Sequence, residues 1–306
     1  MNESNTEIIS STFTNCTRGG ARVAHNSTCE ITDCSFKGVG GYVVGGHYSS
    51  KLFVKNSTYD SCNGNCICYE HSGGRVDKCT FNNCLISPFS TSGIDADPVF
   101  TASVVNVTKG NGAVIRDLSR PVLYDVYFFG GDEAANGMTV SDFSNPTVLG
   151  CWFEGFPKAV VASTNGSTPS FIGCYVTDCG YAFDSCLYSL VTMSRTIIRN
   201  TPVLQNDRSL HDNGGIRLLQ CFQTDEIPVR FETEGLGMIG FSSPVSPLYT
   251  DDFLLRLQMS FPGLCRICGE RVADVFASPC GHRMYCSQCA EQTLKEEEDV
   301  CPICLT

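Results

Sequence analysis

The sequence predicts a protein of two parts: a long coil of short parallel β-strands, followed by a small domain that folds around two zinc ions. Three observations support this prediction. Apolar residues recur about every 23 residues through the first two-thirds of the 306-residue chain. The residues at these positions are mainly aromatic or β-branched, which favours strands over helices. Near the C-terminus, seven cysteines and one histidine stand in four close pairs.

One large apolar anchor marks each period of the repeat. The anchors are Phe13, Phe36, Tyr59, Phe81, Val105, Phe128, Phe153, Val176 and Ile198. A second apolar residue stands five positions before every anchor, from Ile8 to Met193, and a mostly small residue stands two positions before it, from Ser11 to Thr196. Residues two apart on a strand point to the same side, so we expect each anchor and its small neighbour to share an inward face.

Each repeat also contains turn signals and a further strand. Prolines stand seven residues before four consecutive anchors, where a missing amide donor suits a corner better than a sheet interior. They are Pro98, Pro121, Pro146 and Pro169. Gly, Asn or Asp usually follows each anchor by two positions, which predicts a second turn. These residues are Asn15, Gly38, Asn83, Gly155, Asp178 and Asn200. An apolar strand comes next, as in Ala113 to Ile115 and Tyr181 to Phe183.

Short strands joined by corners, repeated nine times, predict a parallel β-helix in which each rung bonds to the next. Nine rungs at about 4.8 Å each give a rod on the order of 43 Å long. Leucine-rich repeats have a similar period, but their leucine and asparagine pattern is missing here. The repeats resemble those of right-handed β-helices in carbohydrate-active enzymes, surface proteins and certain F-box substrate receptors, and the resemblance implies a right-handed coil.

The repeat becomes weaker after Ile198. Residues Ile216 to Leu219 are a candidate for a tenth rung, but no small residue falls at the expected place. Glycines and prolines without a sustained period follow, which is typical of a linker. We therefore expect the β-helix over residues 1–223, a linker over residues 224–262 and the zinc domain over residues 263–306.

The zinc domain has eight candidate metal ligands. They are Cys265, Cys268, Cys280, His282, Cys286, Cys289, Cys301 and Cys304. Two cysteines with two residues between them turn both thiolates toward one tetrahedral ion, and two such pairs close a structural site. Eight ligands therefore predict two zinc ions. Metal binding would supply about 10 kcal/mol or more of folding free energy per zinc to a segment too short to bury a core.

The order and spacing of these ligands resemble the RING finger, in which the single histidine is the fourth of eight ligands; in PHD fingers it comes later. A different two-zinc module is the alternative. The resemblance covers Cys265 to Thr306 and implies an interleaved pairing of ligands. The first zinc would be held by Cys265, Cys268, Cys286 and Cys289. The second would be held by Cys280, His282, Cys301 and Cys304.

RING fingers commonly act as ubiquitin ligases, which dock a ubiquitin-charged E2 enzyme and leave the chemistry to that enzyme. The positions that match the E2-binding surface are Ile267, Leu294, Pro302 and Leu305. Many active RING ligases carry a cation at the position of Leu305, where it contacts both E2 and ubiquitin. The resemblance thus implies a ubiquitin ligase. Because Leu305 replaces the cation, the resemblance does not by itself imply that the chain is active alone.

The thirteen cysteines outside the zinc domain have two interpretations. Most of them, such as Cys34 and Cys79, fall at repeat positions, where a small apolar thiol would pack inside the coil. A further zinc site is the alternative, with Cys62, Cys66, Cys68 and His71 as its ligands.

The net charge and the cysteines indicate which cellular compartment and which kinds of partner to expect. The chain has 32 acidic and 21 basic residues, a formal charge of −11, which argues against a nucleic-acid partner. No apolar stretch is long enough to span a membrane, and the N-terminus lacks the features of a signal peptide. Zinc-binding cysteines must stay reduced, so we expect the cytoplasm, with the nucleus as an alternative.

Three functions are compatible with this sequence. The first is a ubiquitin ligase that recruits an E2 through the RING finger and binds a protein substrate through the β-helix. The second is a scaffold that uses the same two parts only for binding. The third is a carbohydrate-active enzyme, which needs converging carboxylates. Gly131-Asp132-Glu133 is the nearest candidate for these, and an ordinary turn is its simpler interpretation.

Overall fold

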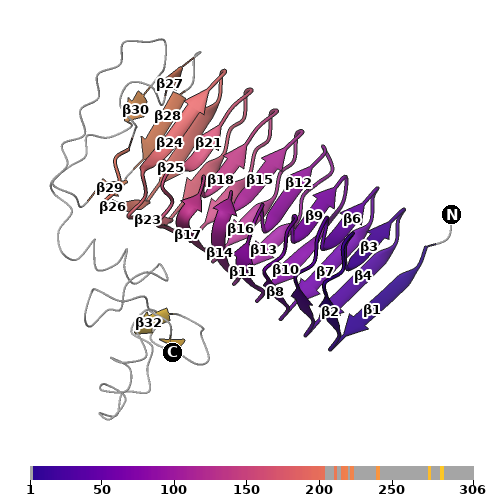
Figure 1. Cartoon of the computed structure of the whole chain (residues 1–306). Helices are drawn as coiled ribbons and strands as arrows, with labels where there is room; N and C mark the ends of the chain where they lie inside the picture. The colour runs from indigo at the N-terminus through magenta and orange to yellow at the C-terminus, as the bar shows by residue number, and fades with distance from the viewer. Residues whose placement is uncertain are drawn as a thin grey trace. The chain divides into compact units, whose positions relative to one another are not determined.

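The computed structural model describes residues 3–203, 210–211, 215–219, 221–223, 239–241, 275–276 and 283–285. The chain divides into two compact units, Met1–Ser243 and Pro244–Thr306. The first unit is a right-handed parallel β-helix whose rungs stack in chain order (Figure 1). The predicted fold class is therefore confirmed. Within the described ranges, no helix is long and apolar enough to cross a membrane.

Three parallel sheets form the sides of the coil. Sheet A contains β1 (Asn5–Ile9), β4 (Thr28–Thr32), β7 (Lys51–Lys55), β10 (Gly73–Asp77), β13 (Val99–Thr101), β16 (Val122–Tyr124), β19 (Thr147–Leu149), β22 (Ser170–Ile172), β25 (Leu190–Ser194), β28 (Gly215–Leu219) and β30 (Ile239–Phe241). Sheet B contains β2 (Thr12–Thr14), β5 (Ser35–Lys37), β8 (Thr58–Asp60), β11 (Thr80–Cys84), β14 (Val104–Gly110), β17 (Tyr127–Ala134), β20 (Trp152–Glu154), β23 (Tyr175–Thr177), β26 (Ile197–Arg199) and β29 (Phe222–Gln223). Sheet C contains β3 (Ala21–Ala24), β6 (Val44–His47), β9 (Ile67–Glu70), β12 (Phe89–Ser92), β15 (Ala113–Arg116), β18 (Met138–Val140), β21 (Ala159–Ser163), β24 (Tyr181–Cys186) and β27 (Leu210–His211).

The predicted register is confirmed in both columns. Each anchor from Phe13 to Ile198 lies opposite the next one in sheet B. The apolar residues from Ile8 to Met193 do the same in sheet A. Sheet C is the further strand expected after the second turn. Nine rungs contribute a strand to all three sheets, which agrees with the nine predicted repeats.

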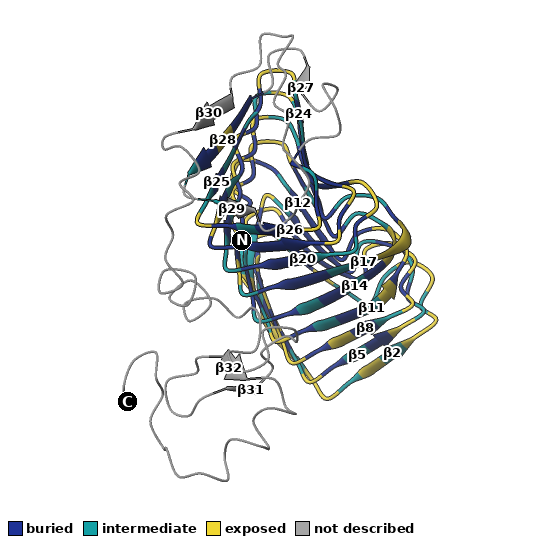
Figure 2. Ribbon diagram, turned by 90° about the vertical axis from the view of Figure 1, so that its left-hand side faces the viewer, coloured by how far each residue is buried: buried dark blue, intermediate teal, exposed yellow. Residues whose placement is uncertain are grey.

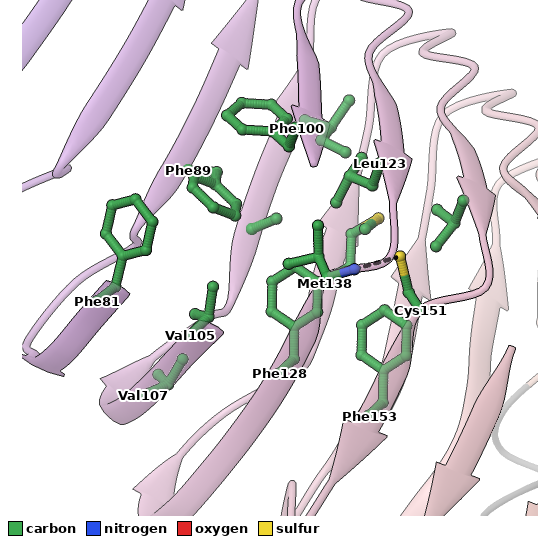
Figure 3. Packing of buried hydrophobic residues seen from close by; sticks show 14 of the residues in the cluster. Phe81, Phe89, Phe100, Val105, Val107, Leu123, Phe128, Met138, Cys151 and Phe153 are labelled. Atoms are coloured by element: carbon green, nitrogen blue, oxygen red, sulfur yellow. Dashed lines mark hydrogen bonds between the residues drawn. The ribbon is translucent and has the colours of Figure 1, made fainter. Parts of the chain in front are cut away.

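The core lies inside the coil, where the three sheets face one another. Figure 2 shows buried residues along the strands and exposed residues mainly at the corners. Aromatic rings stack along the coil axis: the ring centroids of Phe13 and Phe36 are 4.7 Å apart, and those of Phe128 and Phe153 are 4.9 Å apart. In Figure 3, Phe81, Phe128 and Phe153 point into the same interior as Phe89 and Phe100 of the other sheets. Stacked aromatic pairs of this kind contribute about 0.5–1.5 kcal/mol beyond their buried area.

The small residues occupy the corner between sheets A and B. The residue before each of them has a left-handed φ, for example 55° at Asp33 and 53° at Lys78. This turn brings the small side chain inward, next to the same corner of the preceding rung. The hydroxyl or thiol then forms a hydrogen bond with the preceding rung. For example, Ser57 Oγ accepts a hydrogen bond from the Cys34 amide of the preceding rung at 3.1 Å. A large side chain would fill the space that this bond needs.

The coil continues beyond the ninth rung. Leu218 lies opposite Met193, and Gln223 lies opposite Ile198, so β28 and β29 begin a tenth rung. The expectation that no small residue marks this rung was wrong, because Cys221 stands two positions before Gln223 and contacts the Met193 carbonyl at 3.4 Å. The polar Gln223 in the anchor column hid the repeat. Strand β30 lies in the segment expected to be a linker, and its Phe241 lies opposite Leu218.

Candidate metal centre

A short antiparallel hairpin lies inside the predicted zinc domain. It consists of β31 (Val275–Phe276) and β32 (Arg283–Tyr285), with Val275 opposite Tyr285. Strand β32 fills the three positions between His282 and Cys286, and β31 lies between Cys268 and Cys280. In the sequence, the hairpin thus lies between the second and the fifth of the eight predicted ligands.

All the predicted functional residues of this domain lie outside the described residues. They are the eight zinc ligands Cys265, Cys268, Cys280, His282, Cys286, Cys289, Cys301 and Cys304, and the E2-contact positions Ile267, Leu294, Pro302 and Leu305. Their pairing and contacts therefore remain predictions from the sequence.

The donor set itself fits zinc. Seven thiolates and one imidazole are soft or borderline ligands, which select zinc over magnesium or calcium. Eight donors would fill two tetrahedral shells and would leave no open position for water or substrate. Zinc held in this way would stabilise the fold and would take no direct part in a reaction.

The alternative zinc site in the coil is not assembled. Cys66 points into the core, with its Sγ 3.3 Å from Cys84 Sγ. Cys68 alternates along β9 with Ile67 and Tyr69, both of which belong to the core, so it points to the opposite face. His71 lies at the next corner, with a φ of 48°. Among the residues that the structure describes, no three His, Cys, Asp or Glu side chains are grouped to hold a metal ion.

Burial makes most coil cysteines poor metal ligands and poor nucleophiles, because both roles need the thiolate. Burial raises the pKa of Cys79, Cys174 and Cys179 to about 12 and that of Cys68 to about 11. Cys62 is an exception, because a hydrogen bond with Cys66 lowers its pKa. These thiols serve packing, and several also bond the neighbouring rung.

The acidic candidate Asp132-Glu133 lies at the end of strand β17 and does not form a turn. Glu133 is opposite Lys109 of β14, and its carboxylate is 4.0 Å from the Lys109 ammonium. Both side chains are largely exposed. An exposed, ion-paired carboxylate lacks the apolar surroundings of a catalytic acid.

A shallow pocket on the outer face of sheet A is a site that no sequence motif indicated. It has a volume of about 220 Å³ and is lined by Glu30, Thr32, Phe53, Val54, Lys55, Arg75 and Asp77. Asp77 accepts a hydrogen bond from Thr101 at 2.6 Å and lies 3.7 Å from the Arg75 guanidinium. The lining residues come from three rungs, about 23 positions apart. The repeat register was the only signal that could have placed them together.

The comparisons with known proteins agree with this architecture. Residues 1–132 match the family described as a right handed beta helix region, and residues 262–306 match the zinc finger of C3HC4 type, the RING finger. The chain thus combines a right-handed β-helix with a C-terminal RING finger, as predicted. No curated protein matches the chain.

One solved structure similar to this chain is the A-module of the mannuronan C-5 epimerase AlgE4 from Azotobacter vinelandii. It shares 10% sequence identity, with a TM-score of 0.42, and the match covers 73% of this chain and 79% of the module.

Proposed function

We propose that the chain is a RING-type ubiquitin ligase whose β-helix binds a protein substrate. The observation that carries the proposal is the match of residues 262–306 to the C3HC4 RING finger. In such a ligase the RING docks the E2, and a substrate lysine attacks the thioester between E2 and ubiquitin. An amide bond to ubiquitin forms, and the E2 cysteine leaves as a thiolate. The ligase itself forms no covalent intermediate.

The proposed roles follow the two parts of the chain. Ile267, Leu294, Pro302 and Leu305 contact the E2, and the eight ligands hold two zinc ions that maintain that surface. The outer faces of the coil offer a long, regular surface for a protein partner. The charge of −11 disfavours a nucleic-acid partner, and no membrane partner is proposed. The need for zinc-bound thiolates favours the cytoplasm or nucleus.

Self-ubiquitination with a panel of E2 enzymes tests the proposal. We expect ubiquitin chains on the full-length protein with at least one E2, and none with Cys280→Ser, which removes a zinc ligand. Cys186→Ser is the matched control, because it makes the same chemical change in the β-helix and should retain activity. Activity of Cys280→Ser equal to that of an active parent would show that ubiquitin transfer does not depend on the RING finger.

A non-catalytic scaffold is the second candidate, and Leu305 is the observation that favours it. The Leu305 side chain offers no hydrogen-bond donor at a position where many active RING ligases carry a cation. If E2 enzymes bind the RING in a titration and no E2 discharges its ubiquitin, the scaffold explains the result better.

A further inference from the structure

A row of bulky apolar residues follows the corner between sheets C and A. Its members are Ile94, Leu118, Phe143, Leu187 and Tyr188, which we call the corner ridge. Between 39% and 72% of each side chain is exposed. The rungs align these corners: the Leu118 amide donates to the Asp142 carbonyl at 2.8 Å, and the Phe143 amide donates to the Asn165 carbonyl at 2.9 Å. The ridge therefore spans five successive rungs, with members at four of the five corners.

The backbone of the ridge is strained. Leu118, Phe143 and Tyr188 have φ values of 66°, 59° and 62°, and the residue before each is also left-handed. Two consecutive left-handed residues are the pattern of a type I′ turn, which strongly prefers Asn-Gly or Asp-Gly. A bulky side chain in this conformation is unfavourable, because its Cβ crowds the backbone.

The chain contains its own comparison for this turn. The corner between Phe143 and Tyr188 in the row is Asn165-Gly166, with φ values of 53° and 68°, which is the preferred pair. The neighbouring corners replace that glycine with Leu, Phe and Tyr, although they make the same turn. Folding alone thus favours glycine at these positions, and exposure to water favours a polar residue. Strain combined with apolar exposure indicates a functional reason for these side chains.

Phe143 also uses the glycine of the next rung. A Cβ added to Gly166 would lie 2.7 Å from the Phe143 ring, so the ring lies over this glycine. The missing side chain at the fourth corner leaves room for the aromatic ring.

The charges at these corners indicate the chemistry of a partner. These corners carry a net charge of −2, because they have four aspartates and two arginines: Asp95, Asp97, Asp117, Asp142, Arg116 and Arg120. Arg116 is already paired with Asp117, with Nε 3.6 Å from Oδ2. Hydrogen bonds from Asn165 and Ser141 lower the pKa of Asp142, which keeps this carboxylate charged. A second copy of this chain, with its charge of −11, would be repelled.

We propose that the corner ridge docks a basic amphipathic helix of a protein partner. One rung advances about 4.8 Å along the coil, and one turn of an α-helix advances about 5.4 Å. A helix parallel to the coil axis can therefore set an apolar residue against each corner that carries a ridge side chain, with its lysines or arginines beside the aspartates. The ridge from Ile94 to Tyr188 is about 19 Å long, which matches a helix of about 13 residues.

This inference rests on the proposed role of the β-helix in binding a protein substrate, and its test uses neither E2 nor ubiquitin. The probe is a synthetic 18-residue amphipathic peptide of leucine and lysine, titrated by fluorescence anisotropy into the full-length chain. A peptide with glutamate in place of lysine is the charge control. We expect the lysine peptide to bind at least tenfold more tightly than the glutamate peptide.

The decisive variant is the triple substitution Leu118→Gly, Phe143→Gly and Tyr188→Gly. It removes no charge, so general attraction of the peptide to the acidic chain is unchanged. We expect at least a tenfold loss of affinity, together with a melting temperature that rises by about 2 °C or more because the strain is relieved. Tyr124→Ser, an exposed aromatic position on the outer face of sheet A, should bind like the parent.

Four results would overturn the inference. The triple variant could bind as tightly as the parent, or the parent could bind neither peptide. The melting temperature of the triple variant could fall, which would show that these side chains stabilise the fold. Sedimentation could also show that the parent is a dimer and the triple variant a monomer. The ridge would then bind a second copy of this chain. Failure of ubiquitin transfer with intact peptide binding would instead count against the ligase alone.

Discussion

The Ser103 hydroxyl joins two rungs of the coil at the corner between sheets A and B. Its Oγ accepts a hydrogen bond from the Cys79 amide at 3.1 Å and donates one to the Thr101 carbonyl at 2.8 Å. Equivalent bonds link Cys34 to Ser57 and Cys174 to Thr196. These side chains satisfy buried amides that the left-handed corner removes from the regular sheet pattern.

We predict that Ser103→Ala lowers the free energy of unfolding by about 1–3 kcal/mol, because the buried Cys79 amide loses its acceptor. Urea denaturation followed by circular dichroism measures the change. Ser103→Thr should retain most of the stability, since Thr196 fills the same role four rungs further along. A loss below about 0.5 kcal/mol in the alanine variant would contradict the role of this bond.

Zinc content is predicted to depend on the RING and not on the coil. Elemental analysis should find about two zinc ions per chain, fewer in Cys280→Ser, and still two in Cys62→Ser. The strand signal in circular dichroism should persist in Cys280→Ser, because the β-helix has a core of its own. Loss of a zinc ion in Cys62→Ser would support the alternative zinc site in the coil.

The buried thiols are predicted to resist alkylation. With pKa values raised to about 12, Cys79, Cys174 and Cys179 are almost entirely protonated at pH 8, and the thiolate is the reactive form. Mass spectrometry after iodoacetamide treatment should find these cysteines unmodified in the native chain. Removal of zinc with a chelator should make the RING cysteines reactive while Cys79, Cys174 and Cys179 stay protected. Rapid modification of Cys79 in the folded chain would be incompatible with its burial.

The same pKa shifts predict how stability depends on pH. A thiol whose pKa is raised by folding keeps its proton in the folded state after the unfolded chain has lost it. Its contribution to stability is complete below a pH of about 9 and is lost as the pH rises toward 12. Urea denaturation at several pH values should therefore show no thiol-dependent change between pH 7 and 8 and a decrease above pH 9.

Leu305→Arg is predicted to raise the rate of ubiquitin discharge from a suitable E2. Arginine offers several donors in a fixed geometry, while leucine offers none. Charge-assisted hydrogen bonds contribute about 1.5–3 kcal/mol, which corresponds to roughly tenfold or more in rate. Single-turnover discharge to free lysine measures the effect, and Ile267→Ala should abolish discharge in either background. If the parent is active and Leu305→Arg does not change its discharge rate, another residue or partner must hold the conjugate of E2 and ubiquitin in its reactive conformation.

The sequence by itself determined the period, the register and the metal chemistry. Each anchor and its partner five residues earlier recur along the chain at nearly constant spacing, and parallel pairing of equal repeats places equivalent residues opposite one another. The pairing of Phe128 with Phe153 follows from this rule. The RING finger was equally predictable, because the spacing of cysteines in a knuckle is a local property, and the family match over residues 262–306 agrees with it.

The tertiary structure decided what lies at the corners. The bond from the Cys79 amide to Ser103 joins residues 24 positions apart, and it exists only because a left-handed residue turns the small side chain inward. The tenth rung was hidden because the register is carried by backbone pairing, which tolerates a polar residue such as Gln223 in an apolar column. Leu118, Phe143 and Tyr188 are bulky apolar residues, yet they are exposed. They lie outside because a turn with two left-handed residues points its side chains away from the coil, and no pattern of polar and apolar residues encodes that direction.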